Sequence, residues 1–155
     1  KYYSCSFDAL TEAQKQEEEK QISKIFFFRG AAAPAAETKR FIGHNIAKGW
    51  KDSSGAIFDT TQKRLGIAAL WKFTLGERNN DKFLKMWKEV FEKVEAIDGA
   101  EVLLDPGISY NFNEDFMTIT CPVEVKDFLE NHIQEVKPII RAHAAGRKIA
   151  YNFIK

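Results

Sequence analysis

EVLLDPGISYNFNEDFMTITCPVEVK, residues 101–126, is the stretch that decides the predicted fold. Asp105, Pro106 and Gly107 have the composition of a tight turn, because proline presets one turn position and glycine permits the next. Residues 113–115 read as a second, weaker turn. The stretch therefore predicts three short strands joined by two turns.

Apolar and polar residues alternate on both sides of the second turn. The apolar members are Ile108, Tyr110, Phe112, Met117, Ile119 and Cys121. A period of two places such residues on one face of a sheet. The pattern predicts a small antiparallel three-stranded meander over about residues 101–121. Residues 1–7 alternate in the same way, so an N-terminal strand could join it.

The other segments mostly have helical patterns, and they predict five or six helices packed against the sheet. The predicted helices cover about residues 38–50, 60–75, 81–98, 122–138 and 139–153, with a polar arm or helix at about 8–24. Residues 81–98 carry the most continuous apolar stripe. Pro138 is expected to kink or break its helix. The predicted fold class is α+β.

Length and composition indicate one packed domain over residues 1–155. The chain is 45% hydrophobic and 13% aromatic, which is typical of a globule with a substantial core. Its net charge of +1 identifies no partner. Lys1 stands where a start methionine would, so we expect either a mature N-terminus or a trimmed sequence.

Charge is unevenly distributed along the chain. Residues 101–125 hold five carboxylates and no Lys or Arg, whereas residues 35–72 hold seven Lys or Arg against three carboxylates. One interpretation is two solvated faces. The other is a pair of interaction patches, because opposite charges steer encounter. The patch residues would be Lys39, Arg40, Lys48, Lys51, Asp105, Glu114 and Asp115.

Familiar catalytic and cofactor motifs are absent from the sequence. GxGxxG, GxxxxGK[ST], GxSxG, HExxH and EF-hand spacings do not occur, and no Cys/His spacing indicates zinc. We therefore expect no cofactor and no metal, and regard an enzyme as the weaker alternative. Such an enzyme would use His132 and His143 facing each other across Pro138, oriented by Glu135 or Asp105. The competing interpretation is that both histidines are satisfied boundary residues.

Two kinds of ligand remain open. A pocket for a small apolar ligand could lie between the sheet and helix 81–98, lined by Trp71, Trp87, Tyr110 and His132. A fully packed core is the alternative. Nucleic acid has less support, because the row of Lys137, Arg141 and Lys148 adjoins an acidic meander. The sequence contains no run of eighteen apolar residues, so we expect no membrane span.

The two cysteines bear on the compartment. If the N-terminal strand pairs beside the last meander strand, Cys5 and Cys121 would be neighbours and could form a disulfide. A bonded pair would indicate a secreted or processed protein, and two free thiols a cytosolic one. We expect a non-catalytic interaction domain that binds another protein, such as a secreted effector, a viral protein or an assembly subunit.

Overall fold

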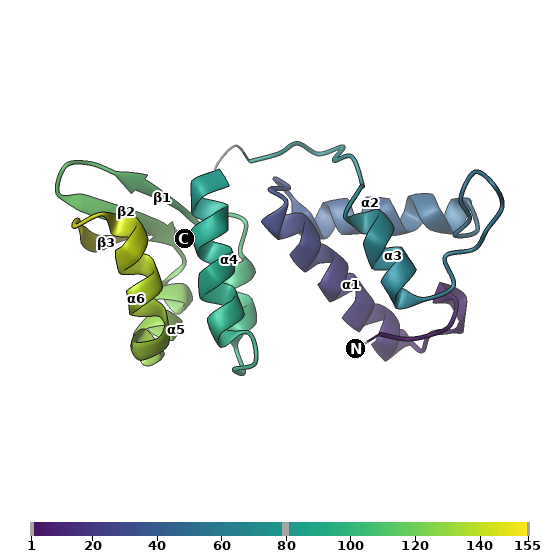
Figure 1. Ribbon diagram of the computed structural model, residues 1–155, viewed down its shortest axis with the longest axis horizontal. Coiled ribbons are helices and arrows are strands. Elements are labelled where there is room, and N and C mark those ends of the chain that lie inside the picture. The colour runs from purple at the N-terminus through teal and green to yellow at the C-terminus, as the bar shows by residue number, and fades with distance from the viewer. Residues whose placement is uncertain (1, 79–80, 155) are drawn as a thin grey trace. The chain divides into compact units, whose positions relative to one another are not determined.

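The computed structural model describes residues 2–78 and 81–154 and divides the chain into two compact units, Lys1–Asn79 and Asn80–Lys155 (Figure 1). The N-terminal unit is helical, and the C-terminal unit combines helices with a three-stranded sheet. The predicted α+β class is therefore confirmed. A single domain over residues 1–155 stays a prediction.

Four helical elements form the N-terminal unit. They are η1 (Phe7–Ala9), α1 (Glu12–Phe28), α2 (Pro34–Ala47) and α3 (Thr61–Ala68). A capping box starts α1, in which Thr11 and Gln14 each bond the backbone N–H of the other. The polar arm or helix predicted at about 8–24 is thus a helix.

Aromatic side chains fill the core of the N-terminal unit. The ring of Phe26 packs edge-on against those of Phe41 and Phe73, and the Phe7 ring lies 4.9 Å from that of Trp50. Ile22 is fully buried beside them. The apolar run at the end of α1, residues 25–28, is therefore a helix end that faces this core.

Two predicted helix boundaries in this unit are wrong. The second helix begins at Pro34 instead of Thr38, because proline suits the first helical position, where no N–H bond is lost. The third begins with the Thr60 cap as predicted but ends at Ala68. Side-chain hydrogen bonds to the backbone of residues 68–75 hold the chain after Ala68 in a non-helical path.

The C-terminal unit contains seven elements. They are α4 (Asp81–Val94), η2 (Ala100–Leu104), β1 (Ser109–Phe112), β2 (Phe116–Cys121), α5 (Val123–Asn131), α6 (Ile133–Ala144) and β3 (Lys148–Phe153). The sheet order is β1-β2-β3, so β2 is central (Figure 1). β1 pairs with β2 antiparallel, and β3 pairs with β2 parallel. The sheet is mixed.

The meander is correct only in its hairpin. Residues 109–121 form the predicted hairpin, but the segment expected to be the first strand is the 3-10 helix η2. The third strand is β3, which was predicted as helix. Of the N-terminal strand proposed for residues 1–7, the described residues 2–7 form no strand, and β1 and β3 occupy both edges of β2.

Pro138 lies inside α6 and does not break it. The break comes at His132, which separates α5 from α6. Pro138 and Gln134 are both exposed, so water can satisfy the carbonyl that the proline leaves without an N–H partner. Pro138 still removes one backbone hydrogen bond from α6, but contact with solvent lowers the free-energy cost of that loss.

Helix α4 supplies the largest core residue of the C-terminal unit. The Trp87 side chain is fully buried, stacks on Phe83 and donates from Nε1 to the Leu103 carbonyl at 2.7 Å. Met86, Val90 and other apolar residues of the same stripe are also buried. The apolar stripe predicted from the sequence therefore faces the core.

Candidate functional site

The outer edge of β3 carries backbone groups that no neighbouring strand satisfies. Lys148 N–H donates to the Asp115 carbonyl and Ile154 N–H to the Cys121 carbonyl, so alternate residues from Lys148 face β2. Ile149, Tyr151 and Phe153 therefore direct N–H and C=O away from β2. Among residues 2–78 and 81–154, no hydrogen bond reaches these outward groups.

A groove of about 600 Å³ runs beside this edge, between β3 and α6. Its apolar part is formed by Ile133 and Ile140 of α6 and by Ile149 and Tyr151 of β3. In the strand register Ile149 pairs with Met117 and Tyr151 with Ile119, and both of those β2 side chains are fully buried. The groove therefore lies on the helix-covered face of the sheet.

Cations border the groove. Among the described residues that line it, one is a carboxylate, Glu130, and four are basic: Lys137, Arg141, Arg147 and Lys148. Glu130 is itself paired with Lys126, with Nζ 3.4 Å from Oε1. The groove thus combines an apolar floor with a net positive rim.

Tyr151 lies at the centre of this edge. Burial, with Cys121 and Glu130 nearby, raises the pKa of the Tyr151 phenol to about 12. The phenol is therefore neutral at physiological pH. Lys126 Nζ lies 5.5 Å from the ring centroid, where a cation is attracted to the aromatic face. This chemistry suits binding better than proton transfer.

The four residues predicted to line an apolar ligand pocket do not gather in one unit. Trp71 belongs to the N-terminal unit, where its Nε1 donates to Glu37 at 3.0 Å. Trp87 and Tyr110 both pack on Phe83 in the C-terminal core. His132 lies between α5 and α6 with its ring 4.6 Å from that of Phe128.

The predicted histidine pair is not assembled across Pro138. His132 precedes α6 and His143 lies in its last turn, so a helix of about 16 Å separates them at 1.5 Å per residue. His143 Nε2 instead contacts Glu89 Oε2 of α4 at 3.1 Å. The expected orienting carboxylates, Glu135 and Asp105, have no such contact with either histidine among the described residues.

The predicted interaction patches fall in different units. Lys39, Arg40, Lys48 and Lys51 are exposed on α2 and the turn after it. The acidic residues serve local turns. Asp105 Oδ1 accepts from Gly107 N–H at 2.7 Å, and Asp115 N–H donates to Asn113 Oδ1 at 2.9 Å. Glu114 is exposed.

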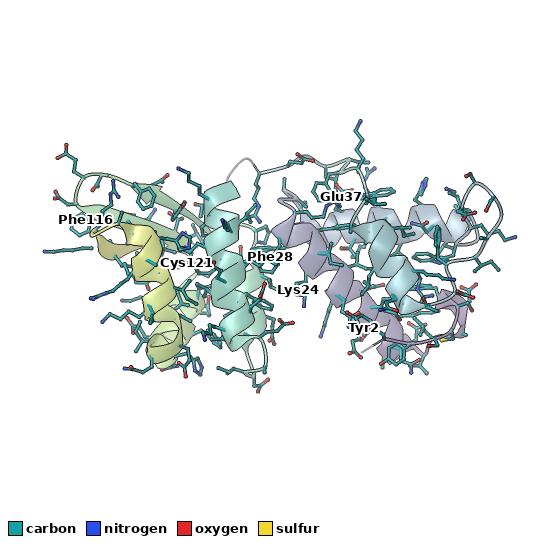
Figure 2. All side chains as sticks on the ribbon, in the orientation of Figure 1. Tyr2, Lys24, Phe28, Glu37, Phe116 and Cys121 are labelled. Atoms are coloured by element: carbon teal, nitrogen blue, oxygen red, sulfur yellow. The ribbon has the colours of Figure 1, made fainter. Side chains whose placement is uncertain are left out.

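Both cysteines are free thiols in the structure. Cys5 is half-buried in the N-terminal unit, and Cys121 is fully buried at the end of β2 (Figure 2). The strand pairing that would have made them neighbours is absent, because the positions beside β2 belong to β1 and β3. The structure thus removes the geometric argument for the bond.

Sequence reasoning placed Lys137, Arg141 and Lys148 on one helical stripe. They do border one groove, but Lys148 is on a strand. The available signal was the alternation of Ile149, Tyr151 and Phe153 after Gly146, which has the period of a strand. The helix prediction overlooked it.

No helix within residues 2–78 and 81–154 is long and apolar enough to cross a membrane. The same residues contain no group of three or more His, Cys, Asp or Glu placed to hold a metal ion. We find no protein-family model, no curated protein and no solved structure that matches the chain.

Proposed function

We propose that the protein is a non-catalytic interaction domain whose C-terminal unit binds an extended segment of another protein along β3. The observation that supports this proposal best is the row of outward N–H and C=O groups on Ile149, Tyr151 and Phe153, which borders a groove. A peptide strand added at this edge would form hydrogen bonds with these backbone N–H and C=O groups. Several peptide-binding domains work in this way, with main-chain bonds giving affinity and side-chain pockets giving specificity.

The edge has few of the features that normally protect a free strand. Exposed edges are usually blocked by proline, a bulge or an inward charge, or are covered by another segment. β3 has none of the first three within Lys148–Phe153, apart from Lys148 at its start, and no segment of the described residues hydrogen-bonds to its outer edge. A partner strand would cover it.

The alternative functions have weaker support. An enzyme using His132 and His143 would need them close together, and α6 separates them. A carrier of a small apolar ligand would need the aromatic residues to enclose a space, whereas Trp87 and Tyr110 both pack on Phe83. The groove beside β3 is open and basic, which suits a polar chain better than an apolar molecule.

Amide hydrogen exchange measured by NMR tests the proposal on the whole chain. Peptides selected from a random library would be added to the labelled protein. We expect binding to slow exchange at Ile149, Tyr151 and Phe153, because their N–H groups become bonded. Ala150 and Asn152 serve as internal controls, since their N–H groups already face β2.

The proposal fails if every selected peptide protects amides elsewhere, or if no peptide protects the outward amides. A second test changes the edge itself. Phe153→Pro removes one outward N–H, and Phe153→Ala removes the same ring while keeping that N–H. Binding that Phe153→Pro weakens much more than Phe153→Ala would support strand addition, and equal effects would contradict it.

A further inference from the structure

We infer that the segment bound along β3 is acidic, and that its carboxylate-rich end lies beside the turn that joins α6 to β3. This inference rests on the proposed function. It identifies the partner by chemistry: an extended peptide with apolar side chains at alternate positions and carboxylates toward one end.

The four cations at the rim of the groove form no ion pair with a carboxylate of the described residues. Lys137, Arg141 and Lys148 have no carboxylate within 4 Å among residues 2–78 and 81–154. Arg147 is engaged by neutral groups, because its Nε donates to the Asn113 carbonyl at 2.6 Å and its guanidinium lies over the Phe112 ring. Within residues 2–78 and 81–154 all four positive charges are therefore without an anionic partner, and a carboxylate-bearing segment would complement them.

The positive charge is concentrated at one end of the groove. Arg141 is in the last turn of α6, Arg147 directly precedes β3, and Lys148 begins that strand. Ala145 and Gly146 make this tight connection with positive φ angles of 53° and 83°. The Lys126–Glu130 pair belongs to α5, away from this turn in the chain. We therefore expect the carboxylate-rich end of the bound segment to lie at this more positive end of the groove.

The apolar floor of the groove favours a partner segment with apolar side chains at every second position. Side chains of an added strand point to opposite faces in turn. Those on the helix-covered side would contact Ile133, Ile140 and Ile149, so β-branched apolar residues suit them. Those on the other side would lie beside Lys148 and Asn152, which suits polar residues. The carboxylates would lie at the end of the segment beside Arg141, Arg147 and Lys148.

Two other occupants fit the edge less well. A second copy pairing through its own β3 would bring two sets of groove cations together, and like charges oppose such an interface. A nucleic acid would meet the cations, but its phosphates offer only acceptors. The outward carbonyls of Ile149, Tyr151 and Phe153 would then stay unsatisfied.

The test uses synthetic peptides and the whole chain. Binding is measured by fluorescence anisotropy for three short peptides that share an alternating valine–serine segment and carry a run of glutamate, serine or lysine at one end. We expect the glutamate peptide to bind at least about tenfold more tightly than the serine peptide and the lysine peptide not to bind. Raising the salt from about 50 to about 500 mM should narrow that difference.

Charge reversal on the protein gives the matched comparison. Lys137→Glu with Arg141→Glu should remove the preference for the glutamate peptide, whereas Lys85→Glu with Lys88→Glu, on the exposed side of α4, should preserve it. Methylating the glutamate peptide on the backbone nitrogens that would face β3 should abolish binding without changing the protein. This last probe does not depend on how any variant folds.

The outcomes separate the inference from the proposed function. Equal binding of glutamate and serine peptides, both lost on backbone methylation, would overturn the acidic partner and leave strand addition standing. Failure of every peptide would overturn both. Tight binding of oligothymidylate that is lost in the double Lys137/Arg141 variant would replace the peptide by a nucleic acid. A dimer that Phe153→Pro dissociates would replace it by a second copy.

Discussion

Arg64 and Glu18 form a bidentate ion pair inside the N-terminal unit, with Nε 2.7 Å from Oε2 and Nη2 2.9 Å from Oε1. Both side chains are completely buried. Arg64 Nη1 also donates to the carbonyls of Cys5 and Phe58. One guanidinium thus links α1, α3 and the segment before η1.

Breaking this pair should cost much of the stability of the N-terminal unit. We expect Glu18→Gln to lower the free energy of unfolding by about 3–5 kcal/mol, because Arg64 would keep a buried charge without its carboxylate. Urea melts of the whole chain measure this. Glu18→Leu combined with Arg64→Met should recover most of the loss, since it buries no charge.

The matched control is Lys63→Ala, which removes the exposed ion pair that Lys63 of the same helix, α3, forms with Asp59 just before it. The unfolding midpoint should barely change, because exposed pairs contribute little. If Glu18→Gln changed the midpoint no more than Lys63→Ala, the buried pair would not be structural.

Glu37 should govern the acid sensitivity of the same unit. Burial alone would raise its pKa, but hydrogen bonds from Trp71, Thr74 and Leu75 outweigh it and hold the Glu37 pKa below 4.5 (Figure 2). The unfolded chain therefore binds this proton more readily. The stability that Glu37 supplies is present above pH 4.5 and is lost as the pH falls through its folded pKa.

Glu37→Gln should remove that loss. Thermal melts from about pH 7 to about pH 3 would show a lower Tm than wild type at neutral pH and a shallower decline in acid. Glu12→Gln, at an exposed position of α1, keeps Glu37 and should keep the wild-type slope. A Glu37→Gln profile parallel to that of the wild type would contradict this assignment.

Cys121 should be protected from alkylation in the folded protein. Burial raises its thiol pKa to about 11, so the reactive thiolate is scarce as well as inaccessible. Mass spectrometry after iodoacetamide treatment without reductant should show Cys5 modified first and both cysteines modified after unfolding. An unfolded, unreduced chain that takes up no alkyl group would instead show a disulfide.

Trp87 should be the most costly residue to truncate in the C-terminal unit. We expect Trp87→Ala to cost about 3–5 kcal/mol through the cavity it leaves. Trp87→Phe keeps most of the volume but leaves the Leu103 carbonyl without its donor, at about 1–3 kcal/mol. A loss under about 1 kcal/mol for the alanine variant would place Trp87 outside the core.

The elements predicted correctly are those with a local signal. The hairpin around residues 109–121 follows from period two and a turn, and α4 follows from one continuous apolar stripe. The start of α3 follows from the Thr60 cap. These signals lie within a few residues of one another, so one sequence suffices to find them.

The errors come from long-range partners. β3 was read as helix because its helical and strand patterns compete, and pairing with β2 decides between them. Glu18 lies in the segment predicted as a polar arm or helix, and its burial could not be predicted because its partner Arg64 lies 46 residues away. The groove was missed for the same reason, since it forms only when β3 joins the sheet beside α6.

The central position of β2 has a consequence for synthesis on the ribosome. α5 and α6 are translated before β3, so one edge of β2 stays uncovered for a time on the order of seconds. Met117, Ile119 and Cys121 belong to that strand, and a chain released before β3 is made would present an apolar edge to chaperones. Completion of the sheet therefore follows the synthesis of α5 and α6, and a chain truncated within α6 should be prone to aggregation.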